Sequence, residues 1–212
     1  MIRQDYFMRM VQRLAQALAQ ALFHKGRQEF EQAENELNAA LEECFGLDTG
    51  IPDLEQIIAL CAAEGGADTM VRLADVFAER GEIRRALGKS SDATNNDALA
   101  LGLYLEVLHS GLVSLDLIQK TEALVERTSG TRLPAAVLKR LLRYYEARGL
   151  LARAEDVLYD WLDTKDPLAP GGGLDFYQRA SRHSDEDLSR GGLSRDEVEQ
   201  GLADWRQKTR DL

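Results

Sequence analysis

Residues 146–158, EARGLLARAEDVL, have the pattern of a turn between two packed helices. Gly149 is expected to end the first helix in the left-handed conformation, which glycine adopts without steric cost. Leu151 would then pack back onto that helix, and the small side chain of Ala154 would let the second helix cross it closely. The stretch therefore predicts a helical hairpin.

The same pattern occurs at residues 78–87, AERGEIRRAL, where Gly81, Ile83 and Ala86 take the corresponding places. A looser copy, HKGRQEFEQAENEL, surrounds Gly26 at residues 24–37. The composition agrees with a chain of helices, because Ala, Leu, Glu, Gln and Arg are abundant and there are only 4 prolines. We therefore expect an all-α protein built from helical hairpins.

The 212 residues are enough for one sizeable core, or for one domain with a small appendage. The apolar content of 44 % and the charged content of 29 % are typical of a soluble globular protein. No apolar run approaches the roughly 20 residues that a membrane span needs. Cys44 and Cys61 form neither a metal-binding pair nor a disulfide framework, which favours a cytoplasmic location.

The N-terminal segment contains the apolar stretch LAQALAQALF at residues 14–23. Gln16 and Gln20 interrupt it, unlike the core of a signal peptide, and apolar residues recur at helical spacing from Phe7 to Ala21. Residues 1–27 hold five basic side chains and one acidic side chain, whereas residues 28–71 hold eleven acidic and no basic ones. We expect a basic helix folded back on an acidic helix; a membrane-surface or organelle-transit role is the alternative.

Further helices are expected along the middle of the chain. Residues 97–109 are apolar nearly all round and should run through the core. Gly111 would end this helix, and Pro134 would open a later one in its first turn. The polar stretch GKSSDATNND, residues 88–97, is predicted to be a mobile loop or helix junction.

Gly81, Gly111 and Gly149 are 30 and 38 residues apart, which brackets the 34-residue period of tetratricopeptide repeats. With its G-x-apolar-x-x-A turns, the chain resembles a degenerate tetratricopeptide array over residues 1–164. Most copies lack the large aromatic residue early in the first helix and the closing proline of that repeat. The opening MIRQDYFMRMVQRLAQAL is also similar to an uncharacterised bacterial family of tetratricopeptide-like proteins. The resemblance implies a right-handed stack of helical hairpins and no particular activity.

The C-terminal part is expected to form a separate small cap. DTKDPLAPGGG, residues 163–173, combines prolines and glycines as linkers do. We therefore divide the chain into a helical-repeat domain (1–164), a linker (165–173) and a helical cap (174–212). Within the cap, Ser184 should begin one short helix, and Ser194 with Glu197 has the spacing of a capping box at the next. Such a cap would cover the apolar face of the last repeat.

No residues are predicted to be catalytic or to bind a metal or cofactor. GKSS at residues 88–91 lacks the earlier glycine of a phosphate loop, and DATNND at 92–97 lacks the glycine and glutamate of a calcium loop. His24, His109 and His183 lie far apart in the sequence, and none has a Cys, Asp or His at metal-ligand spacing. The net charge of -10 argues against nucleic-acid binding. Because no catalytic residues are predicted, we do not expect an enzyme.

Residues 132–153 are locally basic. They carry Arg132, Lys139, Arg140, Arg143, Arg148 and Arg153 against Glu146 alone. Lys139 and Arg143, four residues apart, share a helix face. This face could line a groove that holds an acidic peptide, pair with the acidic region 28–71 in the same or a neighbouring molecule, or simply be solvated.

The sequence thus predicts a non-catalytic adaptor or assembly module that binds a protein or acidic peptide, with self-association as a variant. The residues expected to bind the partner are Arg132, Lys139, Arg140 and Arg143. The alternative is a small-ligand sensor or enzyme with a pocket in the helical core. Its polar groups would come from Tyr104, Tyr144, Tyr145 and His109.

Overall fold

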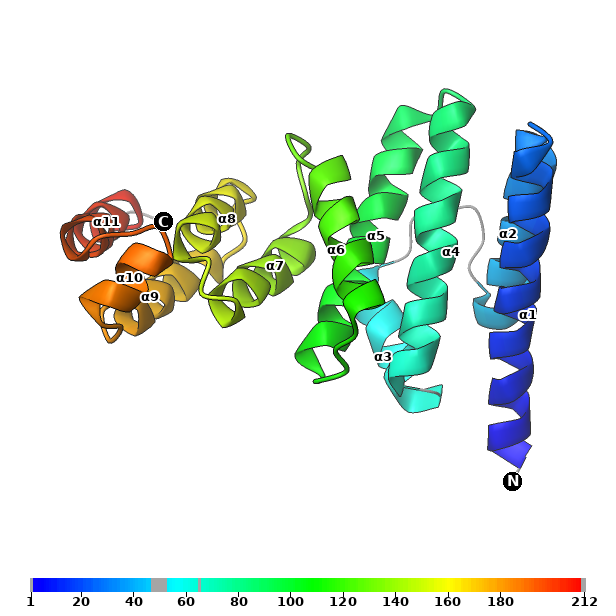
Figure 1. Ribbon diagram of the computed structural model, residues 1–212, viewed down its shortest axis with the longest axis horizontal. Helices are drawn as coiled ribbons and strands as arrows, with labels where there is room; N and C mark the ends of the chain where they lie inside the picture. Colours follow the sequence, from blue (N-terminus) through cyan, green and yellow to red (C-terminus); the bar gives the residue numbers. More distant parts are fainter. Residues whose placement is uncertain (1, 47–52, 65, 211–212) are drawn as a thin grey trace. The chain divides into compact units, whose positions relative to one another are not determined.

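The computed structural model describes residues 2–46, 53–64 and 66–210, which form eleven helices and no strand, so the expected all-α fold class is confirmed. The residues divide into two compact units, Met1–Thr131 and Arg132–Leu212. The first unit contains α1 (Ile2–Gly26), α2 (Phe30–Phe45), α3 (Leu54–Glu64), α4 (Gly66–Ala86), α5 (Ser90–His109) and α6 (Leu115–Arg127) (Figure 1). The second contains α7 (Ala135–Ala147), α8 (Leu151–Asp163), α9 (Ala169–Ala180), α10 (Asp185–Arg190) and α11 (Arg195–Lys208).

The helices α1 and α2 form the expected N-terminal hairpin. Leu14 and Ala17 of α1 are buried, as are Ala33 and Leu37 of α2, because these residues recur at the helical period. The C-terminal end of the stretch LAQALAQALF differs, since Phe23 is 59 % exposed. Phe7, also expected on the buried stripe, lies outside the described side chains.

The basic residues of α1 do not all pair with α2 as the sequence had suggested. Arg13 pairs with Glu43 across the hairpin at 2.7 Å. Lys25, near the end of α1, instead contacts Glu79 and Glu82 of α4, at 2.7 and 2.5 Å. The cations of α1 therefore pair with acidic residues of both α2 and α4.

The prediction that Gly81 ends a helix is wrong. Gly81 lies inside α4, and the turn follows at Gly88, whose φ is +75°. Gly81 instead lets α5 approach, since a Cβ there would lie 2.5 Å from Asp97 Oδ1 and 3.2 Å from the Ala93 carbonyl oxygen. The glycine motif therefore marks a close helix crossing here, about two helical turns before the hairpin turn at Gly88.

The polar stretch at residues 88–97 is also mostly helical, because α5 begins at Ser90. Only the junction before Ser90 is irregular. Asn96 and Asp97 are buried, at 3 % and 0 % exposed, so tertiary contacts outweigh the low helix propensity of this segment. From Ala98 to Leu105, α5 is buried on all sides as expected, including Leu101 and Leu103.

Residues 132–212 have a core of their own. Helices α7 and α8 form the hairpin predicted around Gly149, whose φ is +69°, and Leu151 and Ala154 are buried in it. Helix α9 packs on α8, and α11 packs on α9. Ser194 and Glu197 form the predicted capping box of α11.

The glycines of the expected linker are helical. Residues 165–173 include the first turn of α9, which begins at Ala169. A Cβ at Gly172 would lie 2.2 Å from the Trp161 ring, and one at Gly173 would lie 2.1 Å from the Trp205 ring. The glycines thus give space to two large rings. The sequence placed domain boundaries at residues 164 and 173. Along the chain, the first compact unit ends at Thr131 and the second begins at Arg132.

Candidate functional site

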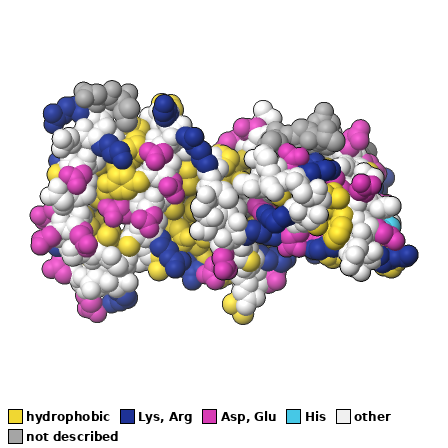
Figure 2. All heavy atoms as spheres, turned by 90° about the horizontal axis from the view of Figure 1, so that it is seen from above, with side chains coloured by type: hydrophobic (Ala, Val, Ile, Leu, Met, Phe, Trp, Pro, Cys, Tyr) yellow, Lys and Arg dark blue, Asp and Glu magenta, His cyan; other side chains and the backbone are white. Residues whose placement is uncertain are grey.

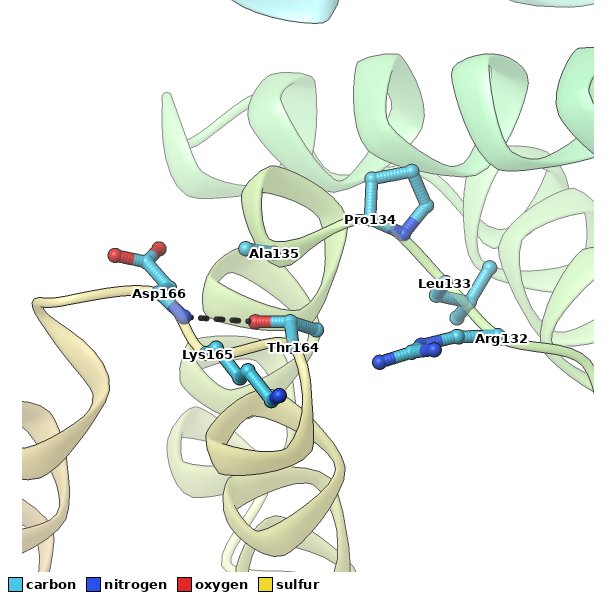
Figure 3. Close-up of a pocket in the computed structure, with 7 residues that line it drawn as sticks. All are labelled: Arg132, Leu133, Pro134, Ala135, Thr164, Lys165 and Asp166. Carbon is cyan, nitrogen blue, oxygen red and sulfur yellow. Dashed lines mark hydrogen bonds between the residues drawn. The ribbon is translucent and has the colours of Figure 1, made fainter. Parts of the chain in front are cut away.

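An open depression lies in the second unit, where the segment before α7 meets the turn after α8 (Figure 3). Its volume is about 430 Å³. The segment leading into α7 contributes three apolar residues and one arginine, and the turn after α8 contributes polar and charged residues. The lining residues are Arg132, Leu133, Pro134, Ala135, Thr164, Lys165 and Asp166.

Local sequence positions both sides of this depression. Pro134 has a φ of -62° and precedes the first residue of α7, as its restricted ring favours. On the other side, the Thr164 hydroxyl donates a hydrogen bond to the Trp161 carbonyl oxygen at 2.7 Å. The same hydroxyl accepts a hydrogen bond from the Asp166 amide at 3.3 Å. Lys165, between them, has a φ of +61°. These contacts hold the turn after α8 in one conformation.

Asp166 is engaged by its own surroundings. Its carboxylate accepts hydrogen bonds from the Leu168 amide at 2.9 Å and from the Trp161 indole at 3.0 Å. Lys139 lies 3.2 Å from the same carboxylate. The Leu168 amide, followed by Trp161 and Lys139, lowers the pKa of Asp166, so this residue is ionised and paired at neutral pH.

Two side chains that line the depression carry positive charges that no described acidic side chain neutralises. Arg132 is exposed and donates one hydrogen bond, to the Asp163 carbonyl oxygen at 2.8 Å. Lys165 is exposed and forms no ion pair with any described residue. Figure 3 shows the charged ends of Arg132 and Lys165 directed toward each other, while the Asp166 carboxylate points away. The depression is therefore suited to a group with negative charge.

The four residues predicted to bind a partner are placed differently from one another. Arg132 lines the depression. Lys139 lies beside it but is occupied by Asp166 and by the Trp161 ring, whose centroid is 5.7 Å from its Nζ. Arg140 donates to the Ala136 carbonyl oxygen at 2.9 Å. Arg143, one turn after Lys139, is exposed and makes no ion pair within the described chain. Sequence reasoning missed Lys165, because it lay in the presumed linker.

Some carboxylates of the acidic region, residues 28–71, form ion pairs within the first unit. Within the first unit Glu34 pairs with Arg84 and Lys89, at 2.7 and 2.6 Å, and Glu43 pairs with Arg13. On the face shown in Figure 2, Lys and Arg side chains alternate with Asp and Glu instead of forming an unbroken basic surface.

The groups named for a pocket in the core have structural contacts. Tyr104 is 1 % exposed and donates to Asp75 at 2.6 Å. Burial, followed by Asp75, raises the Tyr104 pKa, so the hydroxyl remains protonated. Tyr144 and Tyr145 contact each other, with ring centroids 5.6 Å apart. None of these tyrosines lines the depression.

The cysteines are not activated. Burial raises the pKa of Cys61 to about 11. Burial and then Glu43 raise the pKa of Cys44, in the direction that its acidic neighbours suggested. Among the described side chains, no three His, Cys, Asp or Glu residues come together as metal ligands.

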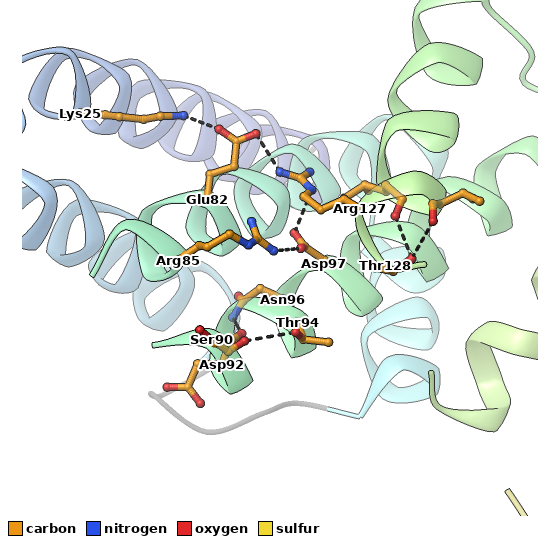
Figure 4. A network of polar contacts seen from close by, with 12 residues as sticks. Lys25, Glu82, Arg85, Ser90, Asp92, Thr94, Asn96, Asp97, Arg127 and Thr128 are labelled. Atoms are coloured by element: carbon orange, nitrogen blue, oxygen red, sulfur yellow. Dashed lines mark hydrogen bonds and ion pairs between the residues drawn. The ribbon is translucent and has the colours of Figure 1, made fainter. Parts of the chain in front are cut away.

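The first unit contains a charged network that the sequence did not reveal (Figure 4). Lys25 of α1 pairs with Glu82 of α4, and Arg127 of α6 contacts Glu82 at 2.8 Å. Arg127 also lies 3.5 Å from Asp97 of α5, which pairs with Arg85 of α4 as well. Burial raises the pKa of Asp97, against the effect of these two arginines. The network joins four helices and has the character of a structural connection.

Comparison with known proteins gives a family but no activity. No curated protein and no solved structure matches the chain. Among the residues described, no helix combines the length and the apolar character that crossing a membrane requires. One family model, described as "Family of unknown function (DUF6483)", matches residues 1–210. The chain belongs to this family.

Proposed function

We propose that this protein is a non-catalytic module that binds an acidic segment of a partner protein at the depression of the second unit. The observation that carries the proposal is the pair of exposed cations, Arg132 and Lys165, that face each other across it. A carboxylate between them would accept two hydrogen bonds from a guanidinium and one from an ammonium group.

The surroundings favour a peptide over an isolated ion. Leu133, Pro134 and Ala135 supply an apolar wall, and Leu168, close by in sequence, is 62 % exposed. An extended segment with acidic and apolar side chains could use both kinds of contact. The exposed Arg143 would extend the basic surface along α7, beyond the occupied Lys139.

The proposal includes the architecture that the sequence suggested. The α1–α2, α4–α5 and α7–α8 hairpins support a tetratricopeptide-like arrangement, for which we propose a right-handed stack. We also propose that the protein acts in the cytoplasm, as an adaptor or assembly factor without enzymatic activity. Self-association, with the basic face of residues 132–153 pairing with the acidic region 28–71 of a neighbouring molecule, is a variant of this proposal.

Binding can be tested with fluorescent peptides that differ only by replacement of Glu with Gln. We expect the acidic peptide to bind the wild type in a salt-dependent manner and the amide peptide to bind at least about tenfold more weakly, since one charge-assisted contact is worth about that factor. Arg132→Glu/Lys165→Glu should abolish the preference. Fluorescence anisotropy measures both affinities.

Arg206→Glu is the matched control, because Arg206 is exposed on α11 and is absent from the depression. It should leave the affinity unchanged. Equal binding of the two peptides, or equal weakening by Arg206→Glu, would reject the depression as the binding site. Lys139 is unsuitable for such a test, because its reversal would place two carboxylates side by side at Asp166.

A further inference from the structure

Arg80, on α4 in the first unit, is a buried cation without a counter-ion in direct contact. It is only 2 % exposed, and its Nε is fully enclosed. None of its nitrogens hydrogen-bonds to a described residue, nor does the residue take part in an ion pair there. Burial, and then the neighbouring Arg84, lower the pKa of Arg80 to about 10, so the side chain is still charged at neutral pH.

A second guanidinium lies one helical turn away. Arg84 is 6 % exposed and uses its Nε to bind Glu34 of α2, at 2.7 Å. Its terminal nitrogens have no acceptor among the described residues. Lys89 also binds Glu34, at 2.6 Å, so this one carboxylate is shared by two cations before Arg80 is considered.

Asp92 of α5 does not complete the charge balance. It is near enough to favour the charged form of Arg80, but it forms no ion pair with it. A buried ion without a hydrogen-bonded partner costs several kcal/mol in general, and such groups in folded proteins are normally satisfied by protein, water or a bound ion. The side chain therefore needs an acceptor that the described residues do not provide.

We infer that Arg80 and Arg84 hold a small oxyanion, with the chemistry of phosphate or sulfate, between α2, α4 and α5. Two guanidinium groups at positions i and i+4 can each direct N–H donors to one tetrahedral anion. Glu34 fixes the Nε side of Arg84, which leaves its terminal nitrogens oriented for a second acceptor. Lys89 and Asp92 both reach the surface, so the cluster lies next to solvent at the α4–α5 turn. This site is separate from the peptide depression and does not depend on it.

Inorganic phosphate is the probe for this site. Thermal unfolding of the full chain would be followed in a zwitterionic buffer while phosphate replaces chloride at constant ionic strength. We expect the midpoint to rise with phosphate and saturate, as specific binding to the folded state requires. Arg80→Met should weaken the apparent affinity about ten- to a hundredfold, since a charge-assisted contact is lost.

Arg72→Met is the matched control, because Arg72 lies on the same helix with a half-exposed side chain. Its phosphate response should equal that of the wild type. Isothermal titration of phosphate into the wild type provides a measurement that does not depend on folding of the Arg80 variant. Absence of both a saturable stabilisation and a binding isotherm for phosphate and sulfate would overturn the site. An unchanged response in a folded Arg80→Met protein would do the same.

Discussion

At the scale of single residues, Gly81 shows how one missing methyl group sets the distance between two helices. It is buried inside α4, and glycine within a helix is normally destabilising relative to alanine. Its benefit is that Asp97 and the Ala93 carbonyl of α5 occupy the space a side chain would need. Asp97 is thereby brought to Arg85 and Arg127, so the glycine also supports the charged network.

We expect Gly81→Ala to destabilise the protein by about 1–3 kcal/mol, because overpacking of the crossing outweighs the gain of about 1 kcal/mol in helix propensity. Gly171→Ala is the control, since Gly171 lies in α9 with no heavy atom within 4 Å of an added Cβ. That change should be neutral or stabilising. Urea unfolding of both variants measures the two free energies. A stabilised Gly81→Ala protein would contradict the close crossing.

At the scale of helices, Glu34 connects α2 to α4 and to the turn before α5. Its side chain and that of Arg84 are each 8 % exposed, so the pair is largely shielded from water. Burial opposes ionisation of Glu34, but hydrogen bonds from Lys89 and Arg84 outweigh it and lower its pKa. A carboxyl with a lowered folded-state pKa stabilises the fold above its unfolded value of about 4.5, and this contribution is lost as the pH falls through the folded-state pKa.

Glu34→Gln should therefore cost about 3 kcal/mol at pH 7, because it leaves Arg84 buried without its partner. The difference from the wild type should shrink as the pH falls below about 4.5. Glu43→Gln on the same helix removes an exposed pair with Arg13 and should cost less than about 1 kcal/mol. Urea unfolding at several pH values tests this; equal costs for the two variants would show that burial adds nothing.

The helices also show which features a sequence can predict. Local signals sufficed where the helix ended at its own glycine, as at Gly149, or where capping chemistry was complete, as at Ser194. The same glycine motif misplaced the turn near Gly81, because its role there depends on Asp97, sixteen residues later. The glycines at 172 and 173 looked like a linker, since their partners Trp161 and Trp205 are distant in sequence.

The candidate site was predictable to a similar degree. Clustering of basic residues directed attention to α7 and to Arg132, which does line the depression. Charge counting could not show that Lys139 is neutralised by Asp166, nor that the turn after α8 brings Lys165 opposite Arg132. These facts depend on the packing of α7 against α8.

At the scale of the whole molecule, the division into two compact units has a spectroscopic consequence. Both tryptophans of the chain, Trp161 and Trp205, belong to residues 132–212. Both are buried, at 5 % and 0 % exposed, so their fluorescence should change when the second unit unfolds. Far-UV circular dichroism, in contrast, follows the helices of both units. The two signals together can therefore separate the unfolding of one unit from that of the other.

We expect Leu101→Ala to act on the first unit alone. Leu101 is fully buried in α5, and truncation of such a leucine costs about 2–5 kcal/mol through lost transfer energy and a residual cavity. The circular dichroism midpoint in urea should fall, while the tryptophan fluorescence midpoint should stay at the wild-type value. Leu158→Ala, at a fully buried position of α8, is the reciprocal control and should lower the fluorescence midpoint. If Leu101→Ala lowered both midpoints equally, the two cores would unfold as one cooperative system, and the compact units would not be independent units of stability.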